Sequence, residues 1–222
     1  MGQGVFITFE GIEGCGKTTQ ANRLGKALSR MGIAHVLTLE PGGTAIGRKM
    51  RHMLLDSKNR ALTPLAELML YAADRAQHVE EVIKPALRGG KWVICDRFSD
   101  ATVVYQGVAR GQDRKLIRLL NHLVTDGIRP HLTLLLDCPV EVGLRRALRR
   151  SMKGQDRFEQ EALSFHRKVR NGYLALAREN KKRFVILDAT ASRGELEVQI
   201  LGQVERFLMG KGLNRVKGSG GW

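Results

Sequence analysis

One glycine-rich segment near the N-terminus carries the residue types that bind phosphate. It matches the pattern G-x-x-x-x-G-K-[ST], in which the glycines let backbone N–H groups turn inward around phosphate oxygens and the next helix adds its positive N-terminus. We expect Lys17 to reach the β- and γ-phosphates of a nucleoside triphosphate and the Thr18 hydroxyl to ligate Mg²⁺, with Asp96 as a second ligand. The residues expected to bind the triphosphate are Gly11, Ile12, Glu13, Gly14, Cys15, Gly16, Lys17, Thr18 and Thr19.

The motifs that the chain lacks, and the charged residues that it contains, narrow the choice of chemical group that accepts the phosphate. It has no Asn-Lys-x-Asp string of the kind that reads guanine in switch GTPases, and it is short for a motor or helicase, so we expect a small kinase. A phosphate acceptor needs arginines to hold it, whereas a hydroxyl acceptor needs a carboxylate base nearby. Both kinds of residue lie near expected strand ends or on helices beside them: the arginines are Arg51, Arg75 and Arg97, and the carboxylates are Glu10, Glu13, Glu40 and Asp96.

Tyr71 and Arg75 are four residues apart and therefore share one face of an expected helix, beside its apolar stripe. An aromatic ring next to a guanidinium group can stack on a planar base and read its edge. Core packing is the alternative for Tyr71, and the pairing with Arg75 favours base recognition.

The segment from Arg145 to Arg157 is densely basic and has a polar, glycine-containing centre. It predicts a short mobile lid over about residues 146–158, which closes over phosphates and keeps water away from the reaction. A solvated basic loop is the alternative interpretation.

The composition of the 222-residue chain is that of an ordinary globular protein with an unusual charge. Apolar residues make up 43% and charged residues 27%, whereas the net charge of +15 favours anionic partners. Phosphorylated small molecules suit this charge better than nucleic acid, because few aromatic residues accompany the basic run from Glu141 to Arg183. No apolar stretch is long enough to cross a membrane, no secretory signal is evident, and three cysteines without Cys-x-x-Cys spacing favour the reducing cytoplasm.

Five short apolar runs alternate with helical patterns, which predicts an α/β fold of three layers, α/β/α, around a five-stranded parallel sheet. Ligands of such sheets bind beyond the carboxyl ends of the strands, where the phosphate loop and Asp96 are expected. We expect one P-loop kinase domain over residues 1–210 and a flexible basic tail over 211–222. The expected strands span 4–10, 35–39, 92–95, 132–136 and 184–187, and the expected helices 17–31, 46–55, 64–88, 116–124, 158–180 and 195–209, with one more opening at Pro139.

Taken in their order along the chain, these motifs resemble those of the bacterial thymidylate kinases, within the nucleoside-monophosphate kinase group of P-loop proteins. Besides the phosphate loop, the specific pieces are the turn Glu40-Pro41-Gly42-Gly43-Thr44, Asp96-Arg97-Phe98 and Tyr105-Gln106-Gly107. The matching pieces run from Phe9 to about Asp188, which is most of the chain. Two positions depart from the family's pattern: Tyr71 stands where phenylalanine is usual, and Ala101 where serine is common.

The resemblance implies ATP-dependent phosphorylation of dTMP to dTDP, with Mg²⁺, by a usually homodimeric enzyme of dTTP biosynthesis. It implies that Lys17 and the lid arginines Arg150 and Arg157 neutralise charge on the transferring phosphate. The roles it implies toward dTMP are phosphate binding by Arg97 with help from Arg51, stacking by Tyr71, reading of the thymine edge by Arg75, contact with the nucleoside by Gln106, and contact with the sugar by Glu13.

Other activities remain open on the same scaffold. One alternative is a deoxynucleoside kinase, with Glu40 as the base, and another is a different nucleoside-monophosphate kinase. Three arginines in the acceptor region argue against the first, because a neutral nucleoside has no phosphate for them to hold. A basic P-loop protein that binds RNA or DNA and uses ATP as a switch is the non-enzymatic alternative.

Overall fold

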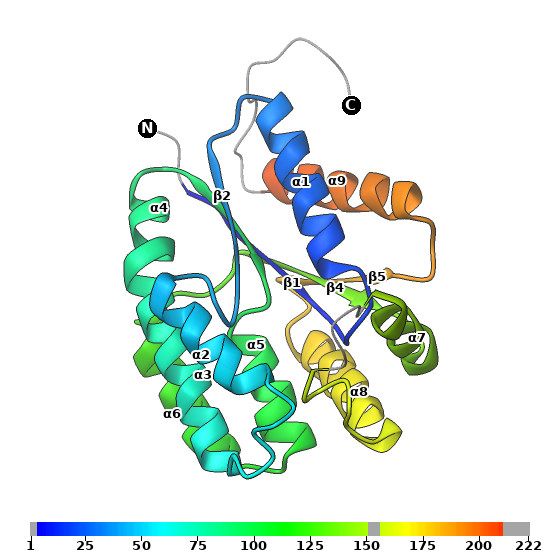
Figure 1. The fold of residues 1–222 in the computed structure, drawn as a ribbon. Helices are drawn as coiled ribbons and strands as arrows, with labels where there is room; N and C mark the ends of the chain where they lie inside the picture. Colours follow the sequence, from blue (N-terminus) through cyan, green and yellow to red (C-terminus); the bar gives the residue numbers. More distant parts are fainter. Residues whose placement is uncertain (1–3, 151–155, 211–222) are drawn as a thin grey trace.

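The strands form one parallel sheet, as expected from the alternating pattern. The structure, a computed structural model, describes residues 4–150 and 156–210. Within these ranges, five strands pair in the order β2-β3-β1-β4-β5. Figure 1 shows α1 and α9 on one side of the strands and α3, α6 and α8 on the other, which is the three-layer arrangement. The strands are β1 (Phe6–Glu10), β2 (His35–Leu39), β3 (Trp92–Asp96), β4 (Leu132–Asp137) and β5 (Phe184–Asp188).

The central strand β1 carries the chain into the phosphate loop. All five of its residues are buried, as an apolar strand between two neighbours and two helical layers must be. The parallel register pairs Phe9 with Asp96 of β3 and Glu10 with Leu135 of β4. The polar residues that end these strands therefore lie along a single edge of the sheet.

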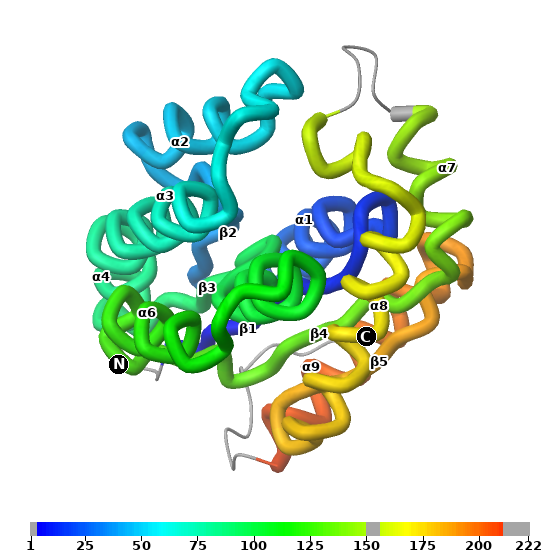
Figure 2. The backbone as a smooth tube through the Cα atoms, turned by 90° about the horizontal axis from the view of Figure 1, so that it is seen from below, coloured from blue at the N-terminus to red at the C-terminus, as the bar shows by residue number. Residues whose placement is uncertain are grey.

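Local sequence signals explain where several helices begin. The hydroxyl of Thr44 accepts a hydrogen bond from the N–H of Gly47, and the hydroxyl of Thr63 accepts one from Ala66, so each threonine caps the helix that follows it. Figure 2 shows α2 and α7 standing apart, with α1 between them. The helical segments are α1 (Lys17–Arg30), α2 (Ala45–Leu55), α3 (Pro64–His78), the π-helix η1 (Val79–Ile83), α4 (Lys84–Arg88), α5 (Ser99–Thr102), the π-helix η2 (Val103–Ala109), α6 (Arg114–Thr125), α7 (Val140–Arg150), α8 (Leu163–Glu179) and α9 (Arg193–Gly210).

One expectation about helices was wrong, and one helical stretch was missed. The long basic helix does not begin at Phe158 but at Leu163, because Asp156 Oδ1 accepts from the N–H groups of Phe158 and Glu159 and holds that stretch in a turn. The helical stretch α5–η2 was not expected at all. Its run of β-branched residues and glycine has low helix propensity, and packing against α8 decides its conformation.

Three further expectations concern residues that the structure describes only in part. Residues 151–155 of the expected lid and the expected tail over 211–222 lie outside the described residues, and so does the side chain of Arg150. Among the helices that are described, none is long and apolar enough to cross a membrane.

Candidate active site

A cavity of about 450 Å³ opens beyond the carboxyl ends of β1, β2 and β3. Its walls come from the phosphate loop, the turn after β2, helices α2 and α3, the segment after β3, and three residues before α8, Asp156, Phe158 and Glu159. Residues that the sequence singled out therefore meet in one place, although they are spread over most of the chain. The expected site residues that line the cavity are Glu13, Gly14, Gly16, Lys17, Thr18, Arg51, Tyr71, Arg75, Asp96, Arg97 and Gln106.

The phosphate loop folds around its own lysine. Lys17 Nζ donates to the carbonyl oxygens of Gly11 at 3.1 Å and Ile12 at 2.8 Å, so the ammonium group lies over the loop. A phosphate bound in the loop would replace these carbonyls as its partner. Cys15 is 1% exposed, which fits a small residue that fills the loop rather than a reactive thiol.

Thr18 and Asp96 meet at the mouth of the loop. The Thr18 hydroxyl donates to Asp96 Oδ2 at 2.5 Å, joining the start of α1 to the end of β3. A hydroxyl and a carboxylate at this separation are the oxygen ligands that Mg²⁺ accepts beside substrate phosphates, so the two residues fit the expected ion. Across residues 4–150 and 156–210, no group of three or more His, Cys, Asp or Glu side chains could hold a metal ion.

Arg97 lies between the phosphate loop and α8. Its backbone has φ 72°, a left-handed conformation that non-glycine residues rarely adopt. One terminal nitrogen donates to the carbonyl of Gly11 at 3.0 Å and to the hydroxyl of Tyr173 at 3.2 Å, and the other donates to Glu13 Oε1 at 3.0 Å. The guanidinium group is thereby fixed at the wall of the cavity.

Glu13 is held as a carboxylate by several partners. The Tyr105 hydroxyl donates to its Oε1 at 2.5 Å, and His166 Nδ1 lies 3.3 Å from its Oε2. Although burial favours the neutral acid, His166, Arg97 and Lys17 hold the pKa of Glu13 well below its usual range. The cavity therefore has a negative group beside the arginine that would hold a phosphate.

Beneath this site lies Glu10, whose carboxyl group favours the protonated form, unlike that of Glu13. It is fully buried and accepts from the N–H of Phe98 at 2.8 Å and from the hydroxyl of Tyr173 at 2.7 Å. Burial, with the charge of Asp100, raises the pKa of Glu10 to about 8. Its position below the cavity wall separates it from the carboxylates that line the cavity.

Arg75, Tyr71 and Gln106 form the wall opposite the phosphate loop. Arg75 is 1% exposed and its Nε donates to Glu40 Oε2 at 2.8 Å, so it lies inside the fold rather than beside the apolar stripe. Gln106 donates to Glu67 Oε1 at 2.8 Å. Glu40 also lines the cavity, but it is 3% exposed and its two carboxylate oxygens are occupied by Arg75 and by a histidine.

Arg157 does not line the cavity. Its Nη2 donates to Glu67 Oε2 at 2.5 Å and its Nε to the carbonyl of Leu54 at 2.9 Å, which ties the segment before α8 to α2 and α3. Neighbours Asp156, Phe158 and Glu159 line the cavity instead. Of the loop residues expected to bind phosphate, Gly11, Ile12, Cys15 and Thr19 also do not line the cavity.

Several site residues were missed by the sequence analysis. Tyr105 was quoted only as part of a motif, and His166, Tyr173 and Glu67 were given no role. His166 and Tyr173 are seven residues apart on α8, so helical spacing would have placed them on one face. Their contacts, His166 with Glu13 and Tyr173 with Glu10 and Arg97, depend on how α8 packs, which spacing does not reveal.

A phosphate loop that faces an arginine-bearing cavity at the carboxyl ends of a parallel sheet defines a P-loop phosphotransferase that acts on small molecules. The family model described as thymidylate kinase matches residues 9–200. The chain belongs to the thymidylate kinase family. This confirms the resemblance drawn from the motifs.

Individual relatives agree with the family model. The chain is 54% identical over 205 residues to the thymidylate kinase of Geotalea uraniireducens (strain Rf4), covering 90% of this chain and 96% of that protein. It is 56% identical over 202 residues to the thymidylate kinase of Geotalea daltonii, covering 89% and 94%. The crystal structure of thymidylate kinase from Ehrlichia chaffeensis matches with a TM-score of 0.73 at 34% identity, covering 91% of this chain and 99% of that one.

Proposed function

We propose that this protein transfers the γ-phosphoryl group of ATP to dTMP, forming dTDP and ADP on the route to dTTP. Membership of the thymidylate kinase family supports the reaction. The observation that carries the proposal is the cavity that Arg97 and Arg51 line together with the phosphate loop. A neutral nucleoside has no use for these arginines, so the deoxynucleoside kinase alternative is not favoured.

On the acceptor side, the protein binds and aligns the phosphate of dTMP. Arg97 is held by the loop carbonyl of Gly11, and Arg51 is held by the carbonyl of Pro41 at 2.8 Å, so both guanidinium groups are oriented before the substrate arrives. The dTMP phosphate is already a nucleophile near neutral pH. No general base is required, which agrees with the occupied carboxylate of Glu40.

On the donor side, backbone N–H groups of the phosphate loop and Lys17 bind the phosphates of ATP. Thr18 and Asp96 would hold Mg²⁺, which when bound neutralises charge on the phosphate oxygens. Arg150 and Arg157 complete the proposed catalytic set with Lys17 and Arg97. Arg157 is now paired with Glu67, so it must leave that carboxylate to reach a phosphate.

The nucleoside of dTMP occupies the wall formed by α3 and η2. Tyr71 stacks on the thymine ring, Arg75 meets its edge, Gln106 contacts the nucleoside and Glu13 faces the sugar. Ala101 lines the same cavity without the hydroxyl that serine would supply. This removes one possible hydrogen bond to the nucleotide and leaves the reaction unaffected.

A coupled assay of ADP release tests the proposal. ATP and Mg²⁺ are supplied with dTMP, dUMP, UMP, AMP or thymidine in parallel reactions. Turnover led by dTMP, with thymidine inert, is the expected result. Preference for thymidine would overturn the proposal and make Glu40 the residue to mutate. Preference for another monophosphate would show that this monophosphate, and not dTMP, is the substrate.

Four wider properties belong to the same proposal. The enzyme acts as a homodimer in the cytoplasm, and residues 1–210 form its single kinase domain. We do not expect nucleic acid as a partner, because basic side chains near this end of the fold are already paired with carboxylates of the protein. Arg157 before α8 pairs with Glu67, and Arg170 within α8 pairs with Asp137.

A further inference from the structure

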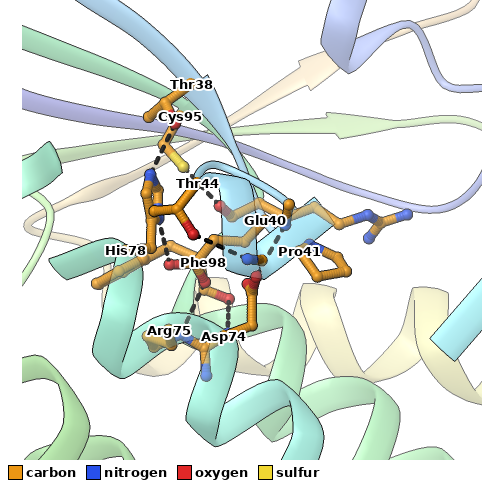
Figure 3. A network of polar contacts seen from close by, with 12 residues as sticks. Thr38, Glu40, Pro41, Thr44, Asp74, Arg75, His78, Cys95 and Phe98 are labelled. Atoms are coloured by element: carbon orange, nitrogen blue, oxygen red, sulfur yellow. Dashed lines mark hydrogen bonds and ion pairs between the residues drawn. The ribbon is translucent and has the colours of Figure 1, made fainter. Parts of the chain in front are cut away.

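A row of buried polar side chains leads from β2 to the wall of the cavity (Figure 3). Thr38 Oγ1 lies 2.7 Å from Nε2 of His78. Nδ1 of the same ring donates to Glu40 Oε1 at 2.8 Å, and Glu40 Oε2 accepts from Arg75 Nε at 2.8 Å. All four side chains are buried, so the row runs inside the fold and ends at the guanidinium group that faces the acceptor base.

The partners of Arg75 leave it little freedom. A guanidinium group has five N–H donors. Nε donates to Glu40, Nη1 donates to Thr102 Oγ1 at 2.9 Å and Asn121 Oδ1 at 3.2 Å, and Nη2 donates to the carbonyl of Phe98 at 3.2 Å. Four of the five N–H groups of Arg75 thus donate to residues within 4–150 and 156–210. A single N–H on Nη2 is left for the cavity.

Glu40 is the charged partner among these groups, because Thr102, Asn121 and Phe98 offer neutral oxygens. A buried guanidinium group needs a counter-charge to stay ionised and fixed. Each carboxylate oxygen of Glu40 has its own partner, Arg75 on one side and His78 on the other. The carboxylate therefore cannot rotate without breaking one contact.

The turn after β2 is packed directly on this row. A Cβ on Gly43 would lie 2.4 Å from Cδ2 of His78, so only glycine lets the turn approach the ring this closely. The N–H of Gly42 donates to Asp74 Oδ1 at 3.0 Å, which anchors the turn to α3. These contacts position Glu40 relative to α3, and hence to Arg75.

We propose that Glu40, oriented by His78, is the positioning residue for Arg75 and sets its single free donor toward the acceptor base. The inference rests on the proposed function, because it takes Arg75 as the residue that meets the base. A lone donor pairs with a ring carbonyl and is repelled by an amino group in the same place. The row therefore keeps this donor in one orientation, which is what Glu40 and His78 contribute to recognition of the base.

The first test is Glu40→Gln, which keeps the shape of the side chain and removes its charge. We expect the KM for dTMP to rise about tenfold or more, as loss of a charged hydrogen-bond partner does, while the KM for ATP and kcat change less than about threefold. The preference for dTMP over dCMP should fall by a similar factor. Glu197→Gln is the matched control, because it removes the ion pair with Arg23 between α1 and α9 and should leave the KM for dTMP unchanged.

A double-mutant cycle separates positioning from general damage. In an Arg75→Met background, adding Glu40→Gln should not raise the KM for dTMP further, because Glu40 acts only through Arg75. If Glu40→Gln does not fold, judged by thermal unfolding, the pair His78→Asn and His78→Val replaces it. His78→Asn can keep the donor to Glu40 and should retain more dTMP affinity than His78→Val.

Three results would overturn the inference. The first is an equal rise in the KM for dTMP when Glu40→Gln is added to the wild type and to Arg75→Met. The second is a parallel rise in the KM for ATP, and the third is an equal loss of dTMP affinity in the two His78 variants. A wild-type protein that does not turn over dTMP would instead refute the proposed function. The two failures are therefore distinguishable in the same assay.

Discussion

Arg97 combines an unfavourable backbone with a complete set of side-chain partners. Its φ of 72° costs about 1 to 3 kcal/mol for a residue with a side chain. The hydrogen bonds to Gly11, Glu13 and Tyr173 hold the guanidinium group in this conformation at the cavity wall. Strain of this kind is tolerated where the position of a side chain matters for binding or chemistry.

Replacing Arg97 tests its role directly. Arg97→Ala should lower kcat/KM for dTMP by about 10² or more, comparable to the loss of one donor that stabilises charge in a transition state. Steady-state kinetics with ATP in excess is the measurement. Arg167→Ala serves as the control, since that exposed arginine pairs only with Glu141 at the surface among the contacts described. A loss below about threefold would remove Arg97 from the site.

Asp74 makes the stability of the fold depend on pH. Its side chain is buried, and burial followed by the charge of Glu40 raises the pKa of Asp74 to about 6. The folded protein therefore holds this proton more tightly than the unfolded chain. Its free energy of unfolding must fall as the pH rises from about 4 to about 6.

Asp74→Asn keeps an oxygen for the N–H of Gly42 and removes the titration. Between pH 4.5 and 7.5 the wild type should lose roughly 2 kcal/mol that the variant does not lose. Urea unfolding of both proteins at the two pH values measures the difference. Parallel changes in the two proteins would show that Asp74 ionises normally in the fold.

Among the elements, the phosphate loop and α7 are packed more closely than side chains would allow. A Cβ on Gly14 would lie 1.9 Å from the carbonyl oxygen of Gly143, and one on Gly143 would lie 2.5 Å from the carbonyl oxygen of Glu13. Gly14 also has a positive φ of +69°. The loop thus depends on two facing glycines for its position against the helix.

Gly14→Ala should therefore destabilise the protein by about 3 kcal/mol or more, because it adds both a clash and an unfavourable φ. ATP binding should weaken with it. Gly202→Ala in α9 is the contrasting change: no atom lies within 4 Å of its Cβ position, and alanine favours the helix by about 0.5–1 kcal/mol. Thermal unfolding of both variants gives the comparison. Equal stability of Gly14→Ala and the wild type would contradict the packing described.

The helices and strands also show which parts of the secondary structure local sequence patterns can predict. The five strands and the positions of α2 and α3 were predicted because apolar runs and helical spacing act over a few residues. The start of α8 and the existence of α5–η2 were not, because Asp156 and the surface of α8 decide them from outside the local sequence. Gly172 of α8 lies where a Cβ would be 3.1 Å from Val104, so the two helices meet through a glycine.

For the molecule as a whole, exposed apolar side chains on adjacent helices support the proposed homodimer. Leu119 and Leu123 of α6 are 65% and 71% exposed, and Leu65 and Met69 of α3 are also exposed. Helices α3 and α6 pack against each other, so these side chains belong to neighbouring surfaces. Large exposed apolar side chains gathered in one region favour a protein interface.

Leu123→Glu should convert the dimer to a monomer, because a charge within an apolar interface is strongly unfavourable. Sedimentation equilibrium measures the mass. Val198→Glu on α9 is the control, since Val198 is equally exposed at 71% and lies on the other side of the sheet. A monomeric wild type would disprove the dimer itself, and a dimeric Leu123→Glu would move the interface elsewhere.

The phosphate loop, the succession of strands and most helices along the chain, and the family could all be predicted from the sequence, because each depends on residue types at fixed short spacings. The fold added the pairings between distant residues: Arg75 with Glu40, Glu13 with His166, and Arg157 with Glu67. Periodicity describes one element at a time, whereas these contacts arise only when separate elements pack. Packing therefore decided which arginines face the cavity and which carboxylates hold them.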